Sequence, residues 1–433
     1  MPPDTTEPVS TQGLDVAIIG GGICGLVCAI ALAQGDRPIR AEIFEAAPKF
    51  AEVGAGITFG HNSVQLLRKL GLLPVLLPYL GTSEDTHQRP FLFLSDGPTQ
   101  ECLYTMQCRE NDEMIKMKHR PSFIEALVPL IDPRRVHFRK RCVSVDKLAN
   151  NRRLVVHFAD GTTHEADLVI GADGIHSACR GFVTGGDKDY VTFSRTVAYR
   201  ALVPTDELVE AGLKIDLKKW PVAWDGEHRC HLLDFFQPDQ RMTAILLQTN
   251  IVVYSTDYRV SLGSVKIEGP WVTKASQAEV MQILEKSGPD PKIIAAHLRE
   301  SSKWHIHCLY PSLASFSREH VVLVGDAAHA MVPFMGAGAG QGIEDVYFLA
   351  KLLTHPAATP DKIEDILVTF NRFRAPRASA VKDRSFMVGN FLQGYDRDGK
   401  TLAECMDGQF EYLHYYDMDQ DVKAAIELVY GSS

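Results

Sequence analysis

The sequence has 433 residues, of which 45% are hydrophobic and 23% are charged, as in an ordinary soluble globular protein. This length exceeds that of a typical single hydrophobic core, so at least two domains are expected. The formal net charge of −9 argues against nucleic acid or an anionic membrane surface as the main partner.

The cysteines and the amino-terminal residues indicate a reducing, cytoplasmic environment. The 9 cysteines are odd in number, scattered and without a C-x-x-C pair, so we expect neither a disulfide framework nor a metal site. The first residues are polar and proline-containing, and they lack the basic start and apolar run of a signal peptide. No apolar stretch approaches the ~18 residues of a membrane span.

A nucleotide-binding fingerprint opens the ordered part of the chain. An apolar strand at 15–19 runs into Gly20-Gly21-Gly22-Ile23-Cys24-Gly25, and a helix is predicted over 23–34. A second strand, 41–44, leads to Glu45, twenty residues after Gly25. This order of strand, glycine loop, helix, strand and acid predicts a dinucleotide site.

Each part of the fingerprint has a physical task. Gly20 makes the turn, Gly22 lets a pyrophosphate approach the backbone, and Gly25 allows helix and strand to pack closely. Glu45 can accept hydrogen bonds from the adenosine ribose. An acid at this position, in place of a basic residue, favours an unphosphorylated ribose.

A second glycine-rich stretch lies late in the chain. The apolar run 321–324 predicts a buried parallel strand that ends at Gly325-Asp326. After Pro333 come the small residues 336–342, which include Gly338 and Ala339, and then an amphipathic helix predicted over 343–353. Such a loop offers free N–H groups to a ligand, although it could also be a plain connection.

A third strand, 166–170, also ends in glycine and aspartate, in the motif Gly171-Ala172-Asp173-Gly174. In a doubly wound α/β sheet the carboxyl ends of these three strands can surround one extended ligand. A nicotinamide dehydrogenase needs the first site only, so three sites predict a long, enclosed and tightly held FAD. A small-residue loop at 52–57, which contains Gly56, is a further candidate contact.

The central block changes character. The strand candidates are mostly β-branched or aromatic and predict a mixed or antiparallel sheet in a separate layer: 196–203, 214–220, 231–236 and 242–248. Helices are predicted over 277–286 and 291–300. Residues 75–105 follow Pro74 and contain three more prolines, Pro78, Pro90 and Pro98, so they are expected to be irregular.

The carboxyl-terminal part is predicted to be helical. A helix over 363–385 carries basic residues along one side, which we expect to be a solvated face: Arg372, Arg374, Arg377, Lys382 and Arg384. The tail after Asp396 is rich in tyrosine and includes a short helix at 422–429. It could cap the molecule or pack on a partner.

These elements predict an α/β fold with a domain assembled from discontinuous segments. We expect 14–75, 106–185 and 316–392 to form an FAD-binding domain of Rossmann-like, doubly wound type. Residues 76–105 and 186–315 would form an inserted β-rich substrate-binding domain, and 393–433 a helical extension.

The sequence resembles the single-component (group A) FAD-dependent aromatic hydroxylases, which have the para-hydroxybenzoate hydroxylase fold, and within them the salicylate hydroxylase-like branch. The resemblance covers the chain from Asp15 to about Asn390. It rests on the fingerprint with Glu45, the pair His119-Arg120, and the motifs that contain Asp173 and Asp326.

The resemblance implies a role for each motif. Glu45 would bind the ribose, and Arg120 would contact the chain that links the flavin to the nucleotide. Asp326 would hold the ribityl hydroxyls, and the backbone of Gly338-Ala339 would lie against the isoalloxazine. Asp173 would interact with both FAD and a transiently bound NAD(P)H.

The resemblance also implies the reaction. NAD(P)H reduces FAD, the reduced flavin and O₂ form a C4a-hydroperoxide, and an electron-rich phenolic ring takes up one oxygen atom. If the attacked carbon bears a carboxylate, CO₂ departs. The protein must exclude water, place the ring and favour its phenolate.

Two residues of the central block are candidates for substrate handling. Arg200 resembles the family's arginine beside the active cavity, and it could anchor a carboxylate or form an interdomain salt bridge. His231 could act as an acid or base, or simply hydrogen-bond its neighbours. The aromatic residues Trp224, Phe235 and Phe236 could be core or cavity lining, and His329 is expected to be structural.

One departure from the family bears on the substrate. Salicylate hydroxylases commonly have histidine and glutamine where this sequence has Phe334-Met335. This favours a related ring, such as a 4-hydroxybenzoate hydroxylated at C1 with decarboxylation. The alternatives are a flavin epoxidase or oxidative dearomatase of fungal-type secondary metabolism, and a non-catalytic flavin-binding redox protein. A monomer or homodimer is expected.

Overall fold

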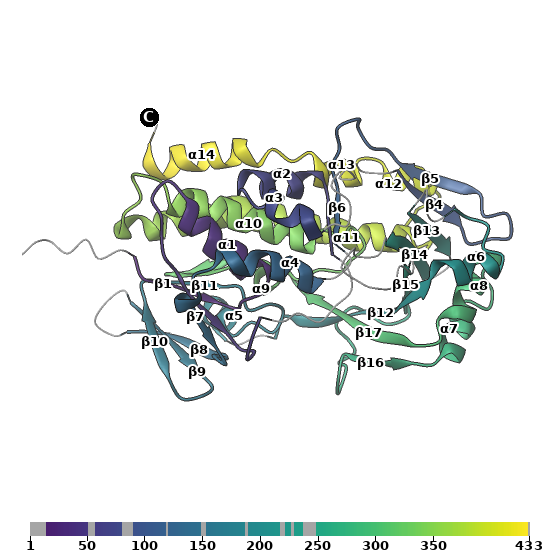
Figure 1. The fold of residues 1–433 in the computed structure, drawn as a ribbon, viewed down its shortest axis with the longest axis horizontal. Coiled ribbons are helices and arrows are strands. Elements are labelled where there is room, and N and C mark those ends of the chain that lie inside the picture. The colour runs from purple at the N-terminus through teal and green to yellow at the C-terminus, as the bar shows by residue number, and fades with distance from the viewer. Residues whose placement is uncertain are drawn as a thin grey trace, which may run out of the picture.

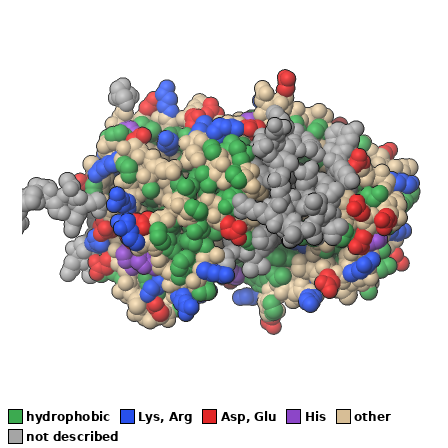
Figure 2. All heavy atoms as spheres, in the orientation of Figure 1, with side chains coloured by type: hydrophobic (Ala, Val, Ile, Leu, Met, Phe, Trp, Pro, Cys, Tyr) green, Lys and Arg blue, Asp and Glu red, His purple; other side chains and the backbone are tan. Residues whose placement is uncertain are grey.

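The computed structural model describes residues 14–50, 57–79, 90–117, 120–148, 153–186, 189–216, 221–226, 229–236 and 248–431. Two sheets lie side by side along the long axis of the molecule (Figure 1). Helices α10 (Gly338–Leu353) and α11 (Ile363–Phe391) follow the same axis, and α10 lies above the strands β1 and β11 in this view. On the face shown in Figure 2, acidic and basic side chains are interspersed.

A six-stranded sheet carries the predicted nucleotide-binding strands, in the order β18-β19-β11-β1-β2-β7. Its strands are β1 (Val16–Ile19), β2 (Glu42–Glu45), β7 (Val136–Phe138), β11 (Leu168–Gly171), β18 (Ser317–Arg318) and β19 (Val321–Leu323). All pairings are parallel except that of β18 with β19. The predicted doubly wound sheet is therefore confirmed.

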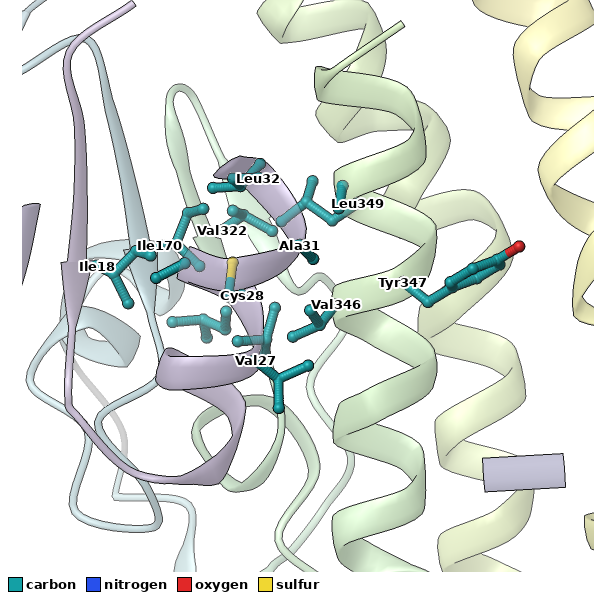
Figure 3. Packing of buried hydrophobic residues seen from close by; sticks show 14 of the residues in the cluster. Ile18, Val27, Cys28, Ala31, Leu32, Ile170, Val322, Val346, Tyr347 and Leu349 are labelled. Carbon is teal, nitrogen blue, oxygen red and sulfur yellow. The ribbon is translucent and has the colours of Figure 1, made fainter. Parts of the chain in front are cut away.

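Buried aliphatic side chains hold the helices against this sheet. Helix α1 (Ile23–Gln34) has the predicted bounds, and its Val27 and Cys28 point between the sheet and α10 (Figure 3). Ile170 and Val322 meet them from β11 and β19, and all four side chains are fully buried. This packing explains why the strands read as continuous apolar runs.

Helix α10 begins five residues earlier than the sequence indicates. It spans Gly338–Leu353, so Gly338, Ala339 and Gly340 form its first turn and are not part of the loop. Small side chains leave this turn open to a ligand, because the first N–H groups of a helix have no partner within it.

Two small sheets flank the parallel one. Strands β8 (Cys142–Lys147) and β9 (Leu154–Phe158) form an antiparallel pair, which β10 (Thr163–Ala166) extends. Strands β3 (Ile57–Phe59) and β6 (Ile115–Met117) form an antiparallel pair. Short helices complete this half: α2 (His61–Lys69), α3 (Leu73–Leu76), α4 (Arg120–Leu127), α5 (Cys179–Thr184) and α9 (Asp326–His329).

The second sheet has eight strands in the order β16-β17-β12-β15-β14-β13-β4-β5. Its strands are β4 (Phe91–Ser95), β5 (Cys102–Met106), β12 (Val191–Pro204), β13 (Val222–Gly226), β14 (Arg229–Phe236), β15 (Gln248–Thr256), β16 (Val272–Ala275) and β17 (Ser301–Leu309). The pair β13 and β4 is parallel and the others are antiparallel, which confirms a mixed sheet.

Two expectations for this half are wrong. The region 75–105 is not simply irregular, because it contributes β4 and β5 to the sheet. Residues 214–216 form no strand, since the backbone N–H of Lys214 donates to Asp290 Oδ1 at 3.3 Å and not to a neighbouring strand. The rest of that candidate, and nearly all of 242–248, lie outside the described residues.

Helices cover one face of the second sheet. Helix α6 (Thr205–Glu210) follows β12, and the predicted pair is confirmed as α7 (Gln277–Ile283) and α8 (Pro289–His297). Their apolar residues pack on the same face as Tyr199, Trp224 and Val253. The opposite face of the sheet is turned toward the glycine-rich loop.

The carboxyl-terminal helices pack on the chain itself. Helix α11 (Ile363–Phe391) is followed by α12 (Leu402–Met406), α13 (Gln409–His414) and α14 (Met418–Tyr430). Tyr347 of α10 points away from the core of Figure 3, and its hydroxyl donates to Asp419 Oδ1 at 2.9 Å. None of the described helices is long and apolar enough to cross a membrane.

The basic side of α11 is not a solvated face. Arg374, Arg377 and Lys382 are 0%, 3% and 2% exposed, whereas Arg372 is exposed as expected. Buried charges require partners. Lys382 Nζ donates to the carbonyl of Leu309 at 2.9 Å, and the two arginines join carboxylates of α10.

Candidate active site

Three strand ends meet at one edge of the parallel sheet. Strand β11 lies between β1 and β19, so the turns after Ile19, Gly171 and Leu323 are neighbours. The sequence predicts this convergence, and the parallel pairing confirms it. The resulting edge is where a doubly wound sheet binds its ligand.

The first turn accepts only glycine at two positions. Gly20 has a φ of +103°, and a Cβ there would lie 2.4 Å from the Ala172 carbonyl oxygen. A Cβ on Gly25 would lie 1.9 Å from the Gly20 carbonyl oxygen. Gly25 therefore has the close-packing task that the fingerprint predicts, and Gly22 stands as the residue before α1.

Glu45 fixes the loop from the end of β2. Its Oε2 accepts the N–H of Gly21 and its Oε1 accepts the N–H of Ala47, both at 2.7 Å. The side chain lines a cavity of about 280 Å³ together with Gly20, Gly22 and Asp173.

Asp173 accepts N–H groups at the start of the short helix α5 through one of its carboxylate oxygens. Its Oδ2 accepts the N–H groups of Ala178 and Cys179 at 2.8 and 3.2 Å. Its Oδ1 is buried and has no hydrogen-bond partner among the described residues. Burial raises the pKa of Asp173 and outweighs the hydrogen bonds that would lower it.

A second cavity, of about 390 Å³, continues from the first one. Gly22, Ala172 and Gly174 line both cavities. The second cavity unites most of the remaining predicted residues, from segments far apart in the sequence: Arg200, Asp326, Gly338 and Ala339. The predicted strand end already places Asp326 at this edge of the sheet, whereas the sequence brings Arg200 to the same site only through the family resemblance.

Asp326 lines this cavity beyond the end of β19. It follows Gly325, whose φ of +61° turns the chain out of the sheet, and it begins the one-turn helix α9. Asp326 is exposed whereas Ala327 and Ala328 are buried. The carboxylate is therefore free to meet hydroxyl groups of a ligand.

A buried ionic cluster behind this turn was missed in the sequence. Asp345 Oδ2 accepts the N–H of Gly325 at 2.9 Å and lies 2.6 Å from Nε2 of His329. Arg374 Nε donates to Asp345 Oδ1 at 2.9 Å, and its Nη1 donates to Glu344 Oε2 at 2.7 Å. The adjacent acids in an otherwise apolar helix were a signal that such a cluster exists.

The cluster keeps Asp345 charged. Burial alone would raise the pKa of Asp345, but the attraction of His329 and Arg374 and the hydrogen bonds outweigh it and hold the pKa below its usual range. Glu344 also pairs with Arg377, at 3.1 Å. The turn before Asp326 is thus fixed by α10 and α11 together.

Arg200 approaches the second cavity from the other sheet. Its backbone pairs with Val252, which lines the same cavity. The guanidinium lies 5.6 Å from the centre of the Trp304 ring, and its Nε is buried without a hydrogen-bond partner among the described residues. No acid pairs with it in the part of the chain that the structure describes, so Arg200 is suited to bind an anion.

The register of β14 does not favour His231 for this cavity. His231 pairs with Val253 and Trp224, whose side chains are buried on the opposite face of the sheet. Leu232 pairs instead with Val252 and Ala223, which line the cavities. Trp224 is therefore core, and the side chains of 229–236, including Phe235 and Phe236, lie outside the described residues.

The remaining predicted contacts are only partly described. Gly56 and His119 lie outside the described residues, and Arg120 is described only as the first residue of α4. Their assignment stays a prediction.

An apolar cavity of about 150 Å³ adjoins the second one. Thr58, Pro333, Gly336 and Ala337 line both of them. Phe334 and Met335 form part of its wall, and the Phe334 ring centre lies 4.9 Å from that of Tyr254.

The first two cavities fit FAD. Together they make one elongated groove with close glycine backbone at one end, carboxylates at Glu45 and Asp326, and a helix start at Gly338. A Cβ at Gly20 or Gly25 would clash with the backbone that shapes the glycine end of this groove.

Comparison with known proteins agrees with this geometry. A family model described as FAD binding domain matches residues 13–385. A salicylate hydroxylase from Pseudomonas putida is 32% identical over 423 residues, which are 95% of this chain and 94% of that protein. The chain belongs to the single-component FAD-dependent aromatic hydroxylases. It is an FAD-dependent monooxygenase of the salicylate hydroxylase-like branch, and NAD(P)H is the co-substrate typical of this family.

A further relative and two solved structures are also similar to this chain. A 6-methylsalicylate 1-monooxygenase from Aspergillus terreus is 30% identical and covers 96% of this chain and 92% of its own. A solved salicylate hydroxylase substrate complex aligns with a TM-score of 0.83 at 28% identity, over 96% of this chain and 98% of that one. The Klebsiella pneumoniae protein HpxO, complexed with FAD and uric acid, shares the fold with a TM-score of 0.69 at 20% identity, over 98% and 99% of the two chains.

Proposed function

We propose that this monooxygenase hydroxylates a phenolic carboxylic acid at the carbon that bears the carboxylate, and that CO₂ is released. Support comes from Arg200, a guanidinium without an acidic partner among the described residues, which lines the same cavity as Asp326 and Gly338. A guanidinium held in this cavity would bind the carboxylate of an anionic ring. Two relatives are a salicylate hydroxylase and a 6-methylsalicylate 1-monooxygenase.

The proposed FAD contacts follow the groove. Gly20, Gly22, Gly25 and Glu45 would hold the adenosine and pyrophosphate, and Asp173 would lie beside them. Asp326 would bind the ribityl hydroxyls and Gly338-Ala339 would support the ring system. Arg120 and Gly56 complete the proposed set. When bound, FAD supplies the activation of O₂ that side chains alone cannot provide.

The chain's own residues would place the ring and exclude water. Arg200 would hold the substrate anion, and the walls formed by Val252, Tyr254 and Pro333 would keep water away. In the overall reaction the ring carboxylate, O₂, NAD(P)H and two protons give the hydroxylated ring, CO₂, water and NAD(P)⁺. The inserted sheet would be the substrate-binding domain.

Phe334 and Met335 favour a ring other than salicylate. The family's histidine at the first position could help to deprotonate an adjacent hydroxyl, whereas Phe334 cannot. A 4-hydroxybenzoate, whose hydroxyl lies opposite the carboxylate, is therefore the favoured class. Epoxidation or oxidative dearomatisation of a fungal-type metabolite is the alternative. A cytoplasmic monomer or homodimer stays a prediction.

A screen of hydroxybenzoates tests the proposal. Each acid is incubated with the purified flavoprotein, NAD(P)H and O₂, and both NAD(P)H consumption and ¹⁴CO₂ from carboxyl-labelled acid are measured. One CO₂ released for each ring hydroxylated supports decarboxylation. A hydroxylated product that retains its carboxylate would contradict it and favour the alternative chemistry.

A further inference from the structure

The apolar cavity beyond Pro333 has the size of a small hydrocarbon group. Its volume is about 150 Å³, and an apolar cavity of roughly 150 Å³ can bind benzene. Six of the side chains that line it are Phe93, Ala223, Phe334, Met335, Phe410 and Leu413. None of the described residues around it is Asp, Glu, Lys or Arg.

The cavity adjoins the flavin groove. Both spaces are lined by Pro333, Gly336 and Ala337, so the two cavities are neighbours, and one ligand that occupied both would pass these residues. One row of paired residues crosses the sheet from strand to strand, in the order Arg200, Val252, Leu232, Ala223 and Phe93. Arg200 is therefore four strands from Phe93, or about 19 Å at the usual strand spacing.

We propose that this cavity holds an apolar substituent of the substrate, so that the preferred substrate is a hydroxybenzoate with a hydrocarbon side chain on the ring. The inference rests on the proposed function. An ionised carboxylate would lose its hydration in the cavity without gaining a charged partner among the described residues, so the acid end must stay near Arg200. A hydrocarbon group suits the other end.

The carboxyl-terminal extension builds one wall of the cavity. Helix α13 supplies Phe410, Leu413 and His414. The buried side chain of Arg377 donates from Nη1 to the Tyr412 carbonyl at 2.9 Å and from Nη2 to the Leu413 carbonyl at 3.3 Å. The wall is thus fixed to α11, and through Glu344 to the helix that follows the glycine-rich loop.

The one histidine in the wall is uncharged at neutral pH. Burial lowers the pKa of His414 to about 4, against the attraction of Asp112, while His61 adds to the lowering. A neutral imidazole is compatible with a hydrocarbon ligand. The imidazole could instead accept a hydrogen bond from a phenol group in the cavity. A comparison of acids with and without an alkyl substituent distinguishes a bound hydrocarbon from a bound phenol.

The test compares 4-hydroxybenzoate with 3-propyl- and 3-pentyl-4-hydroxybenzoate. We expect kcat/KM for the pentyl compound to exceed that for 4-hydroxybenzoate roughly tenfold or more, because each buried methylene favours the bound state. The dissociation constants of the same acids, measured by calorimetry on the flavin-loaded protein without NAD(P)H, should follow this order. Equal or weaker binding of the alkylated acids would overturn the inference.

Filling the cavity gives the matching variant test. Ala223 is 1% exposed in the cavity wall, so Ala223→Leu should reduce the pentyl-to-unsubstituted ratio of kcat/KM at least tenfold. Leu428→Ala, at a side chain that is 55% exposed on α14, should leave the ratio unchanged. If Ala223→Leu loses its flavin, Leu413→Phe is measured in its place. A ratio that neither filling variant lowers would also overturn the inference.

The two proposals can fail separately. If no acid in the panel is hydroxylated but the alkylated acids bind more tightly, the proposed function is wrong. The inference that the cavity binds a hydrocarbon substituent is then still supported. If 4-hydroxybenzoate is hydroxylated and decarboxylated at least as well as its alkylated forms, the proposed function stands and the inference fails.

Discussion

Arg374 donates its Nε hydrogen to Asp345 Oδ1 at 2.9 Å, and both side chains are completely buried. The other oxygen of Asp345 accepts the N–H of Gly325, the residue before Asp326. Helix α11 is thereby connected to the turn that presents the proposed flavin contact. Arg374 and Asp345 stabilise the site only when both are present, because either charge alone would be buried without a partner of opposite charge.

Arg374→Met should unfold the protein more easily. The change leaves Glu344 and Asp345 with one cation fewer, and breaking a buried pair from one side is expected to lower the free energy of unfolding by about 3–5 kcal/mol. Urea denaturation measures it. Arg372→Met, at an exposed site two residues away, should change it by less than about 0.5 kcal/mol. Similar effects for both variants would contradict the importance of the cluster.

Asp326→Ala should lose FAD while the fold persists. The exposed carboxylate lines the second cavity and has no task in the core, so its loss removes ligand contacts. The ratio of flavin to protein absorbance after gel filtration measures the loss, and circular dichroism checks the fold. Asp365→Ala, a surface acid on α11, serves as control. Full flavin occupancy in Asp326→Ala would remove Asp326 from the site.

Two glycine-to-alanine changes in helices should have opposite signs. Gly25→Ala places a Cβ 1.9 Å from a backbone carbonyl oxygen, so we expect a loss of roughly 2–3 kcal/mol in the free energy of unfolding. Gly181→Ala meets nothing within 4 Å in α5 and should raise it by about 0.5–1 kcal/mol. Chemical denaturation compares them, and a harmless Gly25→Ala would show that the close contact is not needed.

Arg200→Ala should impair turnover and leave flavin bound. Hydrogen bonds to charged groups contribute enough that kcat/KM for a hydroxybenzoate should fall roughly 10- to 100-fold. Arg200→Lys keeps the charge but not the paired donors, and it should recover part of the activity. Steady-state NAD(P)H oxidation with product detection measures both. Unchanged kinetics in Arg200→Ala would make the residue structural.

His414 should make the protein less stable in weak acid. Its pKa in the folded state is about 4, below the ordinary 6.5, so the unfolded chain binds the proton more tightly between these values. This contribution to stability is complete above pH 6.5 and is lost as the pH falls toward 4. Between pH 7 and 5 the loss should be about 2 kcal/mol. His414→Gln should remove it in urea denaturations at both pH values, and parallel pH profiles would refute the assignment.

Local patterns in the sequence were sufficient for the parallel sheet. The fingerprint around Gly20 and the apolar runs at 166–170 and 321–324 predict buried parallel strands, because short apolar runs that end in glycine and aspartate are typical of such a sheet. The carboxyl ends of such strands then predict where the flavin groove lies. The family motifs add the residues of that groove.

Long-range contacts explain what local patterns did not predict. The basic residues of α11 resemble a solvated face, and only the acids of α10 facing Arg374 and Arg377 make their burial favourable. Strands β4 and β5 are short and flanked by prolines, so their pairing with β13 is decided by the tertiary structure. Helix α13 can line the apolar cavity because the buried Arg377 donates a hydrogen bond to the Tyr412 carbonyl within that helix.

Isotope incorporation into the product tests the proposed reaction most directly. The flavin-loaded protein is incubated with NAD(P)H, ¹⁸O₂ and a carboxyl-labelled 4-hydroxybenzoate that carries a 3-pentyl group, and the products are analysed by mass spectrometry. The account predicts a hydroquinone with one ¹⁸O atom and one labelled CO₂ for each NAD(P)H consumed. NAD(P)H oxidation that the acid does not stimulate, with the ring recovered unlabelled, would contradict it.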